Sequence, residues 1–307
     1  MKILILGCSD IAIRRIMPAI REIKNLSFDI ASKSKIEKKY GHKNWFNDYD
    51  KAIRKTKANI VYISLMNADH FLYAKKSLNL QKHVIIDKPI TTSFKKTLFL
   101  LKLAKRKKLF LSEALVFDYH RQFKLAKKII KKNNLNINKI IMKFCIPKPK
   151  KNNFKLSKKY GGGCINDMAP YAIGVMRNFL FDKIIYKNLL KKDNKKGVNE
   201  SFSVNVATKK KEFYGIFSHN SEYVNSITFH TSKYIMELYR FSAPPNNKDL
   251  NVLFKSKNII KDIKVKKDNT FKNYLSEVIE KIKNKKFNYY YDRILSDAKL
   301  KYKIFKN

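Results

Sequence analysis

The sequence has few cysteines and no long apolar run. Its three cysteines, Cys8, Cys145 and Cys164, are far apart and form no CxxC pair. An odd number of scattered cysteines supports neither a disulfide framework nor a zinc site, so we expect reduced thiols. No apolar run approaches the about 18 residues that a membrane-spanning helix needs, and the first residues do not resemble a leader. We therefore expect a cytoplasmic protein without a membrane partner.

Acidic residues are also scarce, with 24 Asp and Glu against 68 Lys and Arg and a formal net charge of +44. Such a charge invites a nucleic-acid function, because clustered basic residues neutralise phosphates. Only nine of the basic residues are arginines, whereas phosphate and base recognition prefers the planar arginine fork. We interpret the dispersed lysines as compositional drift of an AT-rich genome and expect no nucleic-acid partner. The surplus charge would still attract anionic substrates such as nucleotides or phosphorylated sugars.

Glycine is rare, and its distribution is uneven. The chain has eight glycines in 307 residues, well below the usual share of about 7%, yet three of them are consecutive at Gly161–Gly163. Such a run needs a backbone reason, either a ligand that approaches closely or a sharp turn into a helix. The hydrophobic content of 44% and the aromatic content of 13% argue against disorder, and the length allows two domains with separate cores.

The start of the chain predicts a dinucleotide site. An apolar strand at Lys2–Leu6 is followed by Gly7 and then by helical apolar spacing over Ile13–Ile20. This is a degraded G-x-G-x-x-G/A fingerprint, in which Ser9 and Ala12 take the second and third glycine positions. An ordinary turn between a strand and a helix is the alternative. The backbone amides expected to face a pyrophosphate are those of Cys8, Ser9, Asp10 and Ile11.

The end of the next strand, Leu26–Ala31, indicates which dinucleotide is bound. NAD enzymes usually place an acid there for the ribose hydroxyls, whereas this chain has Ser32 and Lys33. A hydroxyl and a cation suit the extra phosphate of NADP, so we favour NADP. NAD stays open, because a shift in register would bring Asp29 to the ribose.

A second strand end carries a candidate catalytic lysine. Val84–Ile86 is a β-branched run typical of a strand buried on both faces, and Pro89 prevents its continuation. Ligands of open parallel sheets lie beyond the carboxyl ends of the strands, which is where Lys88 stands. In so lysine-rich a chain the alternative is an ordinary solvated lysine.

Around this lysine the sequence resembles the Gfo/Idh/MocA family, named for glucose-fructose oxidoreductase and inositol dehydrogenase. The family reads T-P-N-x-x-H and then G-K-H-V-x-x-E-K-P, and this chain matches its asparagine, histidine, lysine and proline. Three positions depart mildly from the pattern, with Met66, Gln81 and Asp87 in place of proline, glycine and glutamate. The resemblance implies cofactor contacts from Ser64, Leu65, Asn67, His70, Asp87 and Lys88.

Further along, three segments extend the resemblance into a second domain. Glu113–Phe117, after a predicted strand at Leu109–Leu111, resembles the E-A-x-x-Y/F crossing between domains, and His120 lies where the family often has F-H-P. Asn153–Lys155 resembles N-[FY]-R. The resemblance implies substrate contacts from Phe117, His120 and Lys155, although a structural role is the alternative for His120.

The triple glycine opens the second family motif, G-G-G-x-L-x-D-x-G-x-H/Y. Asp167 and Tyr171 match its functional pair, and their spacing of four places them on one helical face. Ala169 replaces the later glycine, and Pro170 would kink the helix or mark its first turn. The alternative, which the triple glycine makes less favoured, is that Asp167 caps a helix and Tyr171 packs in a core. The resemblance implies that Asp167 and Tyr171 contact the substrate and act in catalysis with Lys88.

Taken over the whole chain, the resemblance implies an α/β protein. A Rossmann NAD(P)-binding domain at 1–118 would precede an α+β domain at 119–307 that has a large mixed, mostly antiparallel sheet. Alternating segments at 202–207, 213–218 and 226–231 suit such strands, and 271–282 and 292–305 predict helices.

The implied activity is hydride transfer between NADP and a hydroxyl or keto carbon of a sugar. Lys88 would stabilise charge on the reacting oxygen, Tyr171 would be the general acid or base, and Asp167 would orient the substrate hydroxyl or Lys88. Tyrosine-type members include sugar-nucleotide ketoreductases, which favours a keto-sugar that is either free or nucleotide-linked. The resemblance also implies a homodimer or homotetramer. The alternative is a non-catalytic NADP-binding regulatory protein of the same fold.

Overall fold

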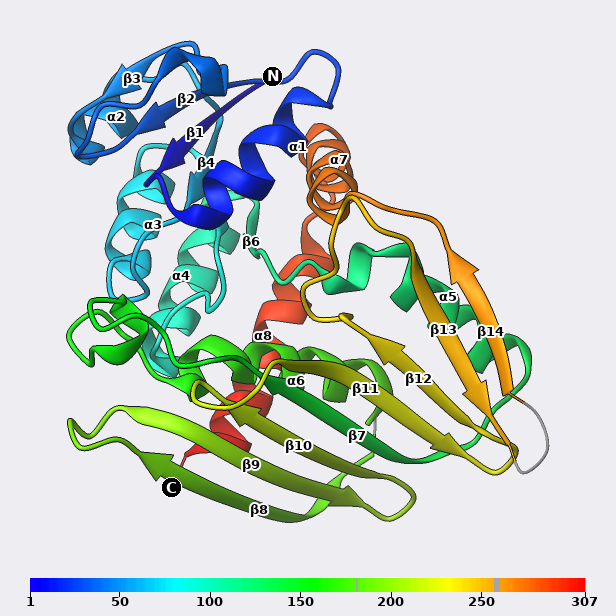
Figure 1. Cartoon of the computed structure of the whole chain (residues 1–307). Helices are drawn as coiled ribbons and strands as arrows, with labels where there is room; N and C mark the ends of the chain where they lie inside the picture. The colour runs from blue at the N-terminus through cyan, green and yellow to red at the C-terminus, as the bar shows by residue number, and fades with distance from the viewer. Residues whose placement is uncertain (181, 257–259, 307) are drawn as a thin grey trace. The chain divides into compact units, whose positions relative to one another are not determined.

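The computed structural model describes residues 1–180, 182–256 and 260–306 (Figure 1). By its internal contacts the chain divides into two units. Unit 1 consists of Met1–Leu115 and Phe271–Lys299, and unit 2 of Val116–Thr270 and Leu300–Asn307. No helix in the described ranges is both long and apolar enough to cross a membrane.

Unit 1 contains a six-stranded sheet in the order β3-β2-β1-β4-β5-β6, and all of its pairings are parallel. The apolar residues of β1, β4 and β5 are fully buried, as expected for central strands covered on both faces. The strand order reverses between β1 and β4, which is where doubly wound sheets bind nucleotides. The strands are β1 (Lys2–Leu6), β2 (Ser27–Ala31), β3 (Trp45–Phe46), β4 (Ile60–Ile63), β5 (His83–Ile86) and β6 (Leu111–Glu113).

One strand of this sheet begins later than predicted. The sequence predicts a strand at Leu109–Leu111 with Glu113 beyond its end, but β6 runs from Leu111 to Glu113. The register explains the difference, because Leu111–Glu113 lies opposite Val84–Ile86 of β5. Glu113 is therefore part of the sheet, and its Oε1 accepts a hydrogen bond from the Ile90 amide at 2.8 Å.

The connections of unit 1 are mostly helical. A π-helical turn, η1 (Ala12–Ile16), continues into the short helix α1 and covers the predicted first helix. The helices are α1 (Met17–Arg21), η2 (Lys38–Tyr40), α2 (Tyr49–Lys55), α3 (His70–Asn79), α4 (Phe94–Lys107), α7 (Thr270–Lys283) and α8 (Asn288–Phe305).

The C-terminal helical segment 271–299 contacts the parallel sheet of unit 1. Tyr274 forms a hydroxyl–hydroxyl hydrogen bond of 2.5 Å with Ser112, and the Tyr291 hydroxyl donates to the Leu109 carbonyl at 2.6 Å. Arg293 donates to the Leu115 carbonyl at 2.9 Å. The apolar spacing of 271–282 predicts a helix with one buried face, but periodicity carries no information about which sheet covers that face.

Unit 2 contains an eight-stranded sheet in the order β14-β13-β12-β11-β7-β10-β9-β8. β7 and β10 are parallel and the other pairings are antiparallel, which confirms the predicted mixed, mostly antiparallel sheet. The strands are β7 (Ile137–Cys145), β8 (Ile184–Asp193), β9 (Asn199–Thr208), β10 (Glu212–Ser218), β11 (Val224–Thr231), β12 (Ile235–Tyr239), β13 (Leu250–Lys255) and β14 (Ile260–Val265).

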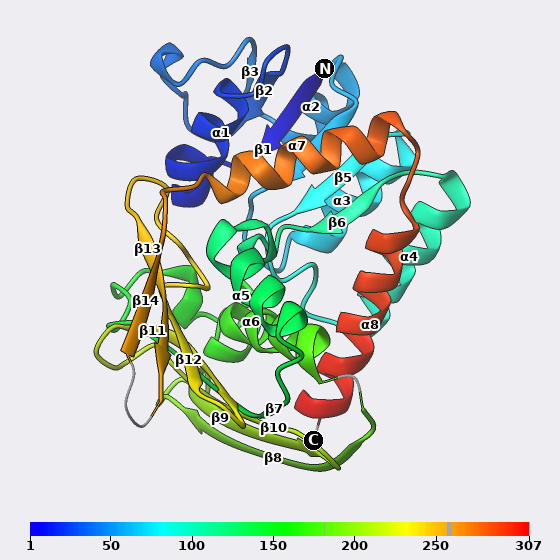
Figure 2. The same ribbon diagram turned by 90° about the vertical axis from the view of Figure 1, so that its right-hand side faces the viewer.

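The two faces of this sheet differ. α5 (Arg121–Lys132) packs on β13, and α6 (Cys164–Phe179) packs on β9 and β10, so that the helices lie on one face (Figure 2). Phe213 and Phe217 of β10 are buried on that face, whereas Tyr214 between them is exposed on the other. The second face has no helix of unit 2 over it within the described residues. Two 3-10 turns, η3 (Phe117–Tyr119) and η4 (Phe154–Leu156), complete the unit.

Candidate active site

The turn after β1 requires glycine. Gly7 has φ +93, and a Cβ built on it would lie 2.2 Å from the backbone oxygen of Ser64, just after β4. Only glycine tolerates both this backbone conformation and this approach. The turn therefore lies against the neighbouring strand at the point where the strand order reverses, as a pyrophosphate-binding turn does.

Ser9 closes this turn where the fingerprint has its second glycine. Its Oγ accepts a hydrogen bond from the Ala12 amide at 3.1 Å and forms a 2.7 Å hydrogen bond with Ser64 Oγ. Burial raises the pKa of Cys8, so the thiol stays neutral near neutral pH. Asp10 is exposed and forms an ion pair with Arg14, four residues further along the chain.

The acid of β2, Asp29, is not available to a ribose. Asp29 is 1% exposed and is held by Thr56 Oγ1 at 2.8 Å, Asn44 Nδ2 at 2.9 Å and Lys2 Nζ at 3.3 Å. It therefore lies within the strand, and the register shift that would bring it to the ribose does not occur. Ser32 is buried and accepts a 3.0 Å hydrogen bond from Trp45 Nε1, whereas Lys33 is exposed.

Lys88 is the second residue after β5, and the residues around it are held by hydrogen bonds. Asp87 accepts hydrogen bonds from Ser64 Oγ at 2.5 Å and from the Tyr62 hydroxyl at 2.7 Å. Burial raises the pKa of Asp87, while these two hydrogen bonds and the charges of His70 and Lys88 act in the opposite direction. Burial and the Asp87 charge raise the pKa of Tyr62 well above its ordinary value, so Tyr62 remains a donor. A continuous hydrogen-bond chain therefore runs from Ser9 through Ser64 to the residue before Lys88.

His70 supports the same loop from the other side. It is fully buried, and its Nδ1 and Nε2 lie 2.8 Å from the Pro89 oxygen and 3.1 Å from the Leu65 oxygen. The Lys88–Pro89 peptide bond is cis. Asn67, also predicted to contact the cofactor, is buried and lies three residues before His70 in the sequence. The contacts of His70 are structural, and its predicted contact with the cofactor stays a prediction.

In unit 2 the triple glycine turns the chain into α6. Gly161 and Gly163 have positive φ values of 73 and 103, and Gly163 is the N-cap of the helix. A Cβ on Gly162 would lie 2.5 Å from the backbone oxygens of Phe154 and Lys155. The glycines therefore serve both a sharp turn into the helix and a close backbone approach. The group that approaches is the backbone at Phe154 and Lys155.

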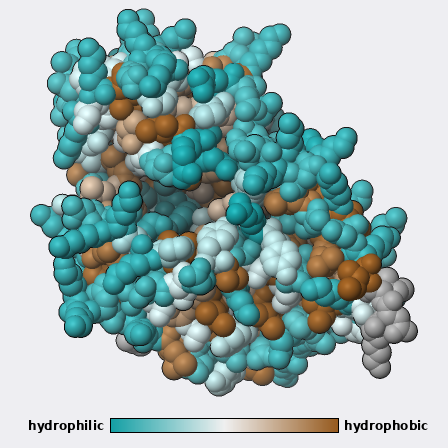
Figure 3. All heavy atoms as spheres, in the orientation of Figure 1, coloured by the Kyte–Doolittle hydropathy of each residue, from teal (hydrophilic) through white to brown (hydrophobic). Residues whose placement is uncertain are grey.

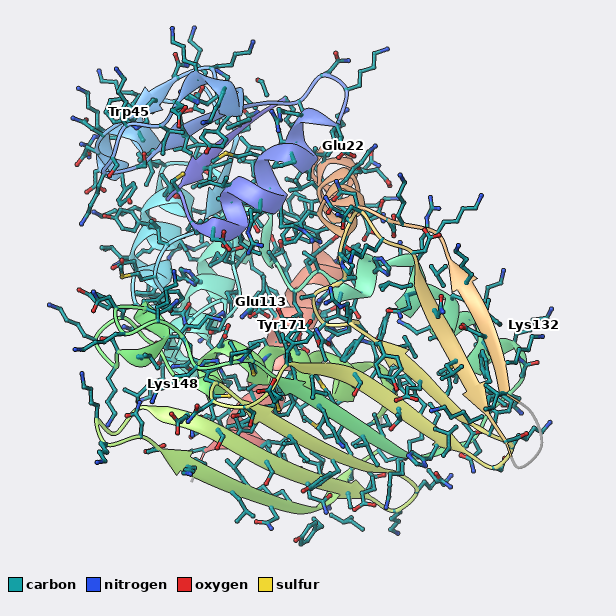
Figure 4. All side chains as sticks on the ribbon, viewed as in Figure 1. Glu22, Trp45, Glu113, Lys132, Lys148 and Tyr171 are labelled. Carbon is teal, nitrogen blue, oxygen red and sulfur yellow. The ribbon has the colours of Figure 1, made fainter. Side chains whose placement is uncertain are left out.

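This turn places Asp167 in the first helical turn and Tyr171 one turn further along α6. Asp167 Oδ2 lies 2.7 Å from Lys155 Nζ and 3.0 Å from His219 Nε2. The Tyr171 ring contacts Phe144 edge-on at 5.4 Å between centroids and lies 6.2 Å from Phe117 (Figure 4). The predicted helix and its shared face are confirmed, and Asp167 is held by two basic side chains rather than serving as the N-cap.

The other predicted substrate residues lie deeper. Phe117 is fully buried and contacts Phe123 and Phe241 as well as Tyr171. His120 is 1% exposed, and its Nδ1 accepts the Gln122 amide at 3.1 Å at the start of α5. These positions support the structural alternative for His120, and substrate contacts from both residues stay predictions.

Asp167 has two basic partners, Lys155 and His219, and the sequence motifs do not include His219. It follows directly after β10 and is 1% exposed. The alternating segment 213–218 predicts the strand that precedes His219. The position of a polar residue just beyond that strand end is the only sequence signal that could have indicated His219 as a site residue. Its partnership with Asp167 joins positions 52 residues apart, which local patterns do not encode.

The structure thus brings the predicted residues together in two groups. Unit 1 joins the Gly7 turn, Ser64 and the Asp87–Lys88 loop, and unit 2 joins Lys155, Asp167, Tyr171 and Phe117. Lys88 and Tyr171 belong to different units, so their convergence stays a prediction.

Comparison with known proteins agrees with this geometry. Residues 1–115 match the family model described as "Oxidoreductase family, NAD-binding Rossmann fold", named for Gfo, Idh and MocA. A dTDP-3,4-didehydro-2,6-dideoxy-alpha-D-glucose 3-reductase of Saccharopolyspora spinosa is 26% identical over 183 residues, 57% of this chain and 55% of that protein. A D-xylose 1-dehydrogenase (NADP(+)) of Haloferax volcanii is 22% identical over 182 residues, 57% of this chain and 56% of that protein. The matches span little more than half the length of these relatives.

Solved structures share the fold over almost the whole chain. KijD10, a 3-ketoreductase from Actinomadura kijaniata in complex with NADP and TDP-benzene, aligns with a TM-score of 0.94 and 19% identity, covering 99% of this chain and 97% of that one. An aldose-aldose oxidoreductase from Caulobacter crescentus aligns with a TM-score of 0.87 and 16% identity, covering 100% and 96%. The predicted two-part α/β fold is therefore confirmed. Residues 1–115, which form the parallel sheet of unit 1, match the model of the Gfo/Idh/MocA oxidoreductase family and its NAD-binding Rossmann fold.

Proposed function

We propose that the protein is an NADP-dependent oxidoreductase that transfers a hydride between the cofactor and a keto or hydroxyl carbon of a sugar. The observation that carries this proposal is the placement of Lys88 at the carboxyl end of β5, in the same parallel sheet as the Gly7 turn. Relatives described as a sugar 3-reductase and a xylose dehydrogenase support the reaction class.

The residues of unit 1 fit a dinucleotide phosphate. The Gly7 turn has no room for a Cβ and lies at the switch point of the sheet. Asp29 is sequestered, and the exposed Lys33 is the first charged side chain beyond β2. A cation next to the strand end, with the acid of the strand itself sequestered, favours a 2′-phosphate over free ribose hydroxyls. The solved KijD10 complexes contain NADP, which agrees with this assignment.

When bound, the nicotinamide supplies or accepts the hydride. In our proposal the Lys88 ammonium hydrogen-bonds the reacting oxygen of the sugar and stabilises negative charge that develops on it. The Tyr171 phenol transfers the proton to or from that oxygen, and Asp167 orients the sugar through a neighbouring hydroxyl. Asp87, held by Ser64 and Tyr62, fixes the backbone from which Lys88 projects. These roles require Lys88 and Tyr171 to meet beside the cofactor.

We further propose a keto-sugar linked to a nucleotide as substrate. The 3-reductase relatives act on dTDP-sugars by their names, and KijD10 binds TDP-benzene. The net charge of +44 would raise the local concentration of a diphosphate-bearing substrate.

A turnover screen tests this function. The purified protein would be incubated with NADPH and a panel of nucleotide-linked and free keto-sugars, while NADPH absorbance is followed. Oxidation of NADPH that depends on a keto-sugar supports the proposal. Binding of NADPH without turnover on any member of the panel would favour a non-catalytic NADP-binding regulator instead.

The choice of cofactor gives a separate prediction for Lys33. We expect the Lys33→Ala variant to raise the KM for NADPH about tenfold and to leave the KM for NADH unchanged, because it removes a charge-assisted hydrogen bond to the 2′-phosphate. Lys35→Ala, an exposed lysine two residues on, is the matched control. A wild-type enzyme that prefers NADH would contradict the assignment.

We also propose that the protein forms a homodimer or homotetramer through the open face of the unit 2 sheet. Figure 3 shows apolar side chains among polar ones over this face. Tyr214, Leu190 and Tyr239, on strands of this sheet, are 37%, 64% and 51% exposed. Light scattering should report a mass two or four times the chain mass of 36.2 kDa. A monomer at micromolar concentration would argue against this assembly.

A further inference from the structure

We propose that His219 is a positioning residue that fixes the Asp167 carboxylate for the reaction. The inference rests on the proposed function, to which it adds a residue outside the family-like motifs. Its basis is a contact within unit 2. His219 Nε2 lies 3.0 Å from Asp167 Oδ2, and the histidine ring is 1% exposed.

The carboxylate is reached from three separate elements. Asp167 lies in the first turn of α6, Lys155 belongs to the turn η4, and His219 follows β10. Lys155 Nζ and His219 Nε2 both contact the same oxygen, Oδ2, at 2.7 and 3.0 Å. The sheet side is rigid, because the His219 amide donates to the Glu200 oxygen at 2.9 Å between β9 and β10. Contacts from a loop and from a strand end restrict how the Asp167 side chain can rotate.

The hydrogen-bond pattern assigns the tautomer of His219. An ionised carboxylate only accepts hydrogen bonds, so Nε2 carries the hydrogen. His219 Nδ1 is buried and has no hydrogen-bond partner among the described residues. A hydrogen on Nδ1 would be buried without an acceptor, so the ring is the neutral Nε2–H form. A neutral donor orients the carboxylate and leaves its charge to be balanced by Lys155.

The burial of His219 separates its role from that of Asp167. With 1% of its surface exposed, the ring cannot contact a substrate, whereas the Asp167 side chain is 13% exposed and the Lys155 side chain 26%. His219 therefore acts through Asp167. Lys155 alone would neutralise the charge of Asp167, but its long, flexible side chain would not fix the position of the carboxylate.

Two amide variants test the proposal as a matched pair. Gln at position 219 can place its amide N–H near the position of histidine Nε2, whereas Asn is too short to reach Asp167. We expect His219→Asn to lower kcat about 10- to 100-fold with the KM for NADPH unchanged. His219→Gln should stay within about threefold of wild type. Circular dichroism and thermal unfolding confirm that each variant is folded.

A double-mutant cycle with Asp167→Asn separates positioning from general packing. If His219 acts through Asp167, adding His219→Asn to Asp167→Asn lowers kcat no further. Equal losses in the Asn and Gln variants, or multiplicative effects in the double variant, would overturn the proposal. If His219→Asn does not fold, His219→Gln decides alone, and a folded Gln variant more than tenfold slower than wild type also overturns it.

A spectroscopic readout distinguishes failure of this inference from failure of the proposed function. Long-range ¹H–¹⁵N NMR of the wild-type protein should show a His219 ring with a hydrogen on Nε2 and none on Nδ1, assigned by its loss in His219→Gln. Wild-type protein without any keto-sugar turnover but with this signature contradicts the proposed function while the hydrogen bond stands. Turnover with the Nδ1–H form contradicts the role of His219.

Discussion

Replacing Lys88 with methionine should lower kcat at least about a thousandfold while NADPH still binds. Methionine keeps the length and apolar stem of the side chain but removes the ammonium that we propose stabilises charge on the reacting oxygen. The dinucleotide contacts that we propose for the Gly7 turn lie elsewhere in unit 1, so a titration with NADPH fluorescence should give a dissociation constant close to that of the wild type.

Lys95→Met is the matched control for this variant. Lys95 is an exposed lysine in the first turn of α4, seven positions away, and its replacement should leave kcat unchanged. Because the chain is so rich in lysine, the comparison separates the loss of one particular ammonium from the loss of one positive charge among many. Full turnover by Lys88→Met would remove the proposed mechanism.

Replacing Gly7 with alanine should destabilise unit 1 by about 3 kcal/mol or more and abolish dinucleotide binding. Two separate costs add here, a strained backbone at φ +93 and a Cβ placed 2.2 Å from the Ser64 oxygen. Relief would move the turn away from β4, and this would break the hydrogen bond between Ser9 and Ser64. Chemical denaturation and NADPH titration measure the two effects.

Gly41→Ala separates strain from the close approach. Gly41 has a similar φ of +84, but the nearest atom to its Cβ is the flexible Arg21 Cδ at 3.2 Å. We expect a cost of about 1 to 2 kcal/mol and unchanged NADPH binding. If both variants lose the same stability and both retain the cofactor, the contact between the Gly7 turn and β4 is not what requires glycine.

The departures from the family pattern become intelligible in the structure. Ser9, in place of a glycine, does not merely fill the turn, since its hydroxyl binds the Ala12 amide and Ser64. Asp87, in place of a glutamate, is long enough to accept from both Ser64 and Tyr62. These substitutions connect the predicted phosphate turn with the predicted catalytic loop by side-chain hydrogen bonds.

Local patterns predicted the elements that carry the site. Val84–Ile86 forms a buried strand because β-branched residues occupy both of its faces, and the helix from Cys164 begins after glycines whose φ values suit few other residues. The ambiguity over Asp29 could not be resolved in this way. Its three partners, Lys2, Asn44 and Thr56, come from different parts of the chain, and only the assembled sheet brings them to one carboxylate.

By itself the amino-acid sequence determined the parallel sheet, the glycine turn after its first strand, the position of Lys88 just beyond a strand end and the helix that carries Asp167 and Tyr171. Each depends on residues that are neighbours along the chain, where backbone preference and side-chain periodicity act. The tertiary structure alone decided that 271–299 packs on unit 1, that Asp29 is sequestered and that His219 meets Asp167. These contacts join residues 15 or more positions apart, and their formation depends on how whole elements pack together rather than on any local preference.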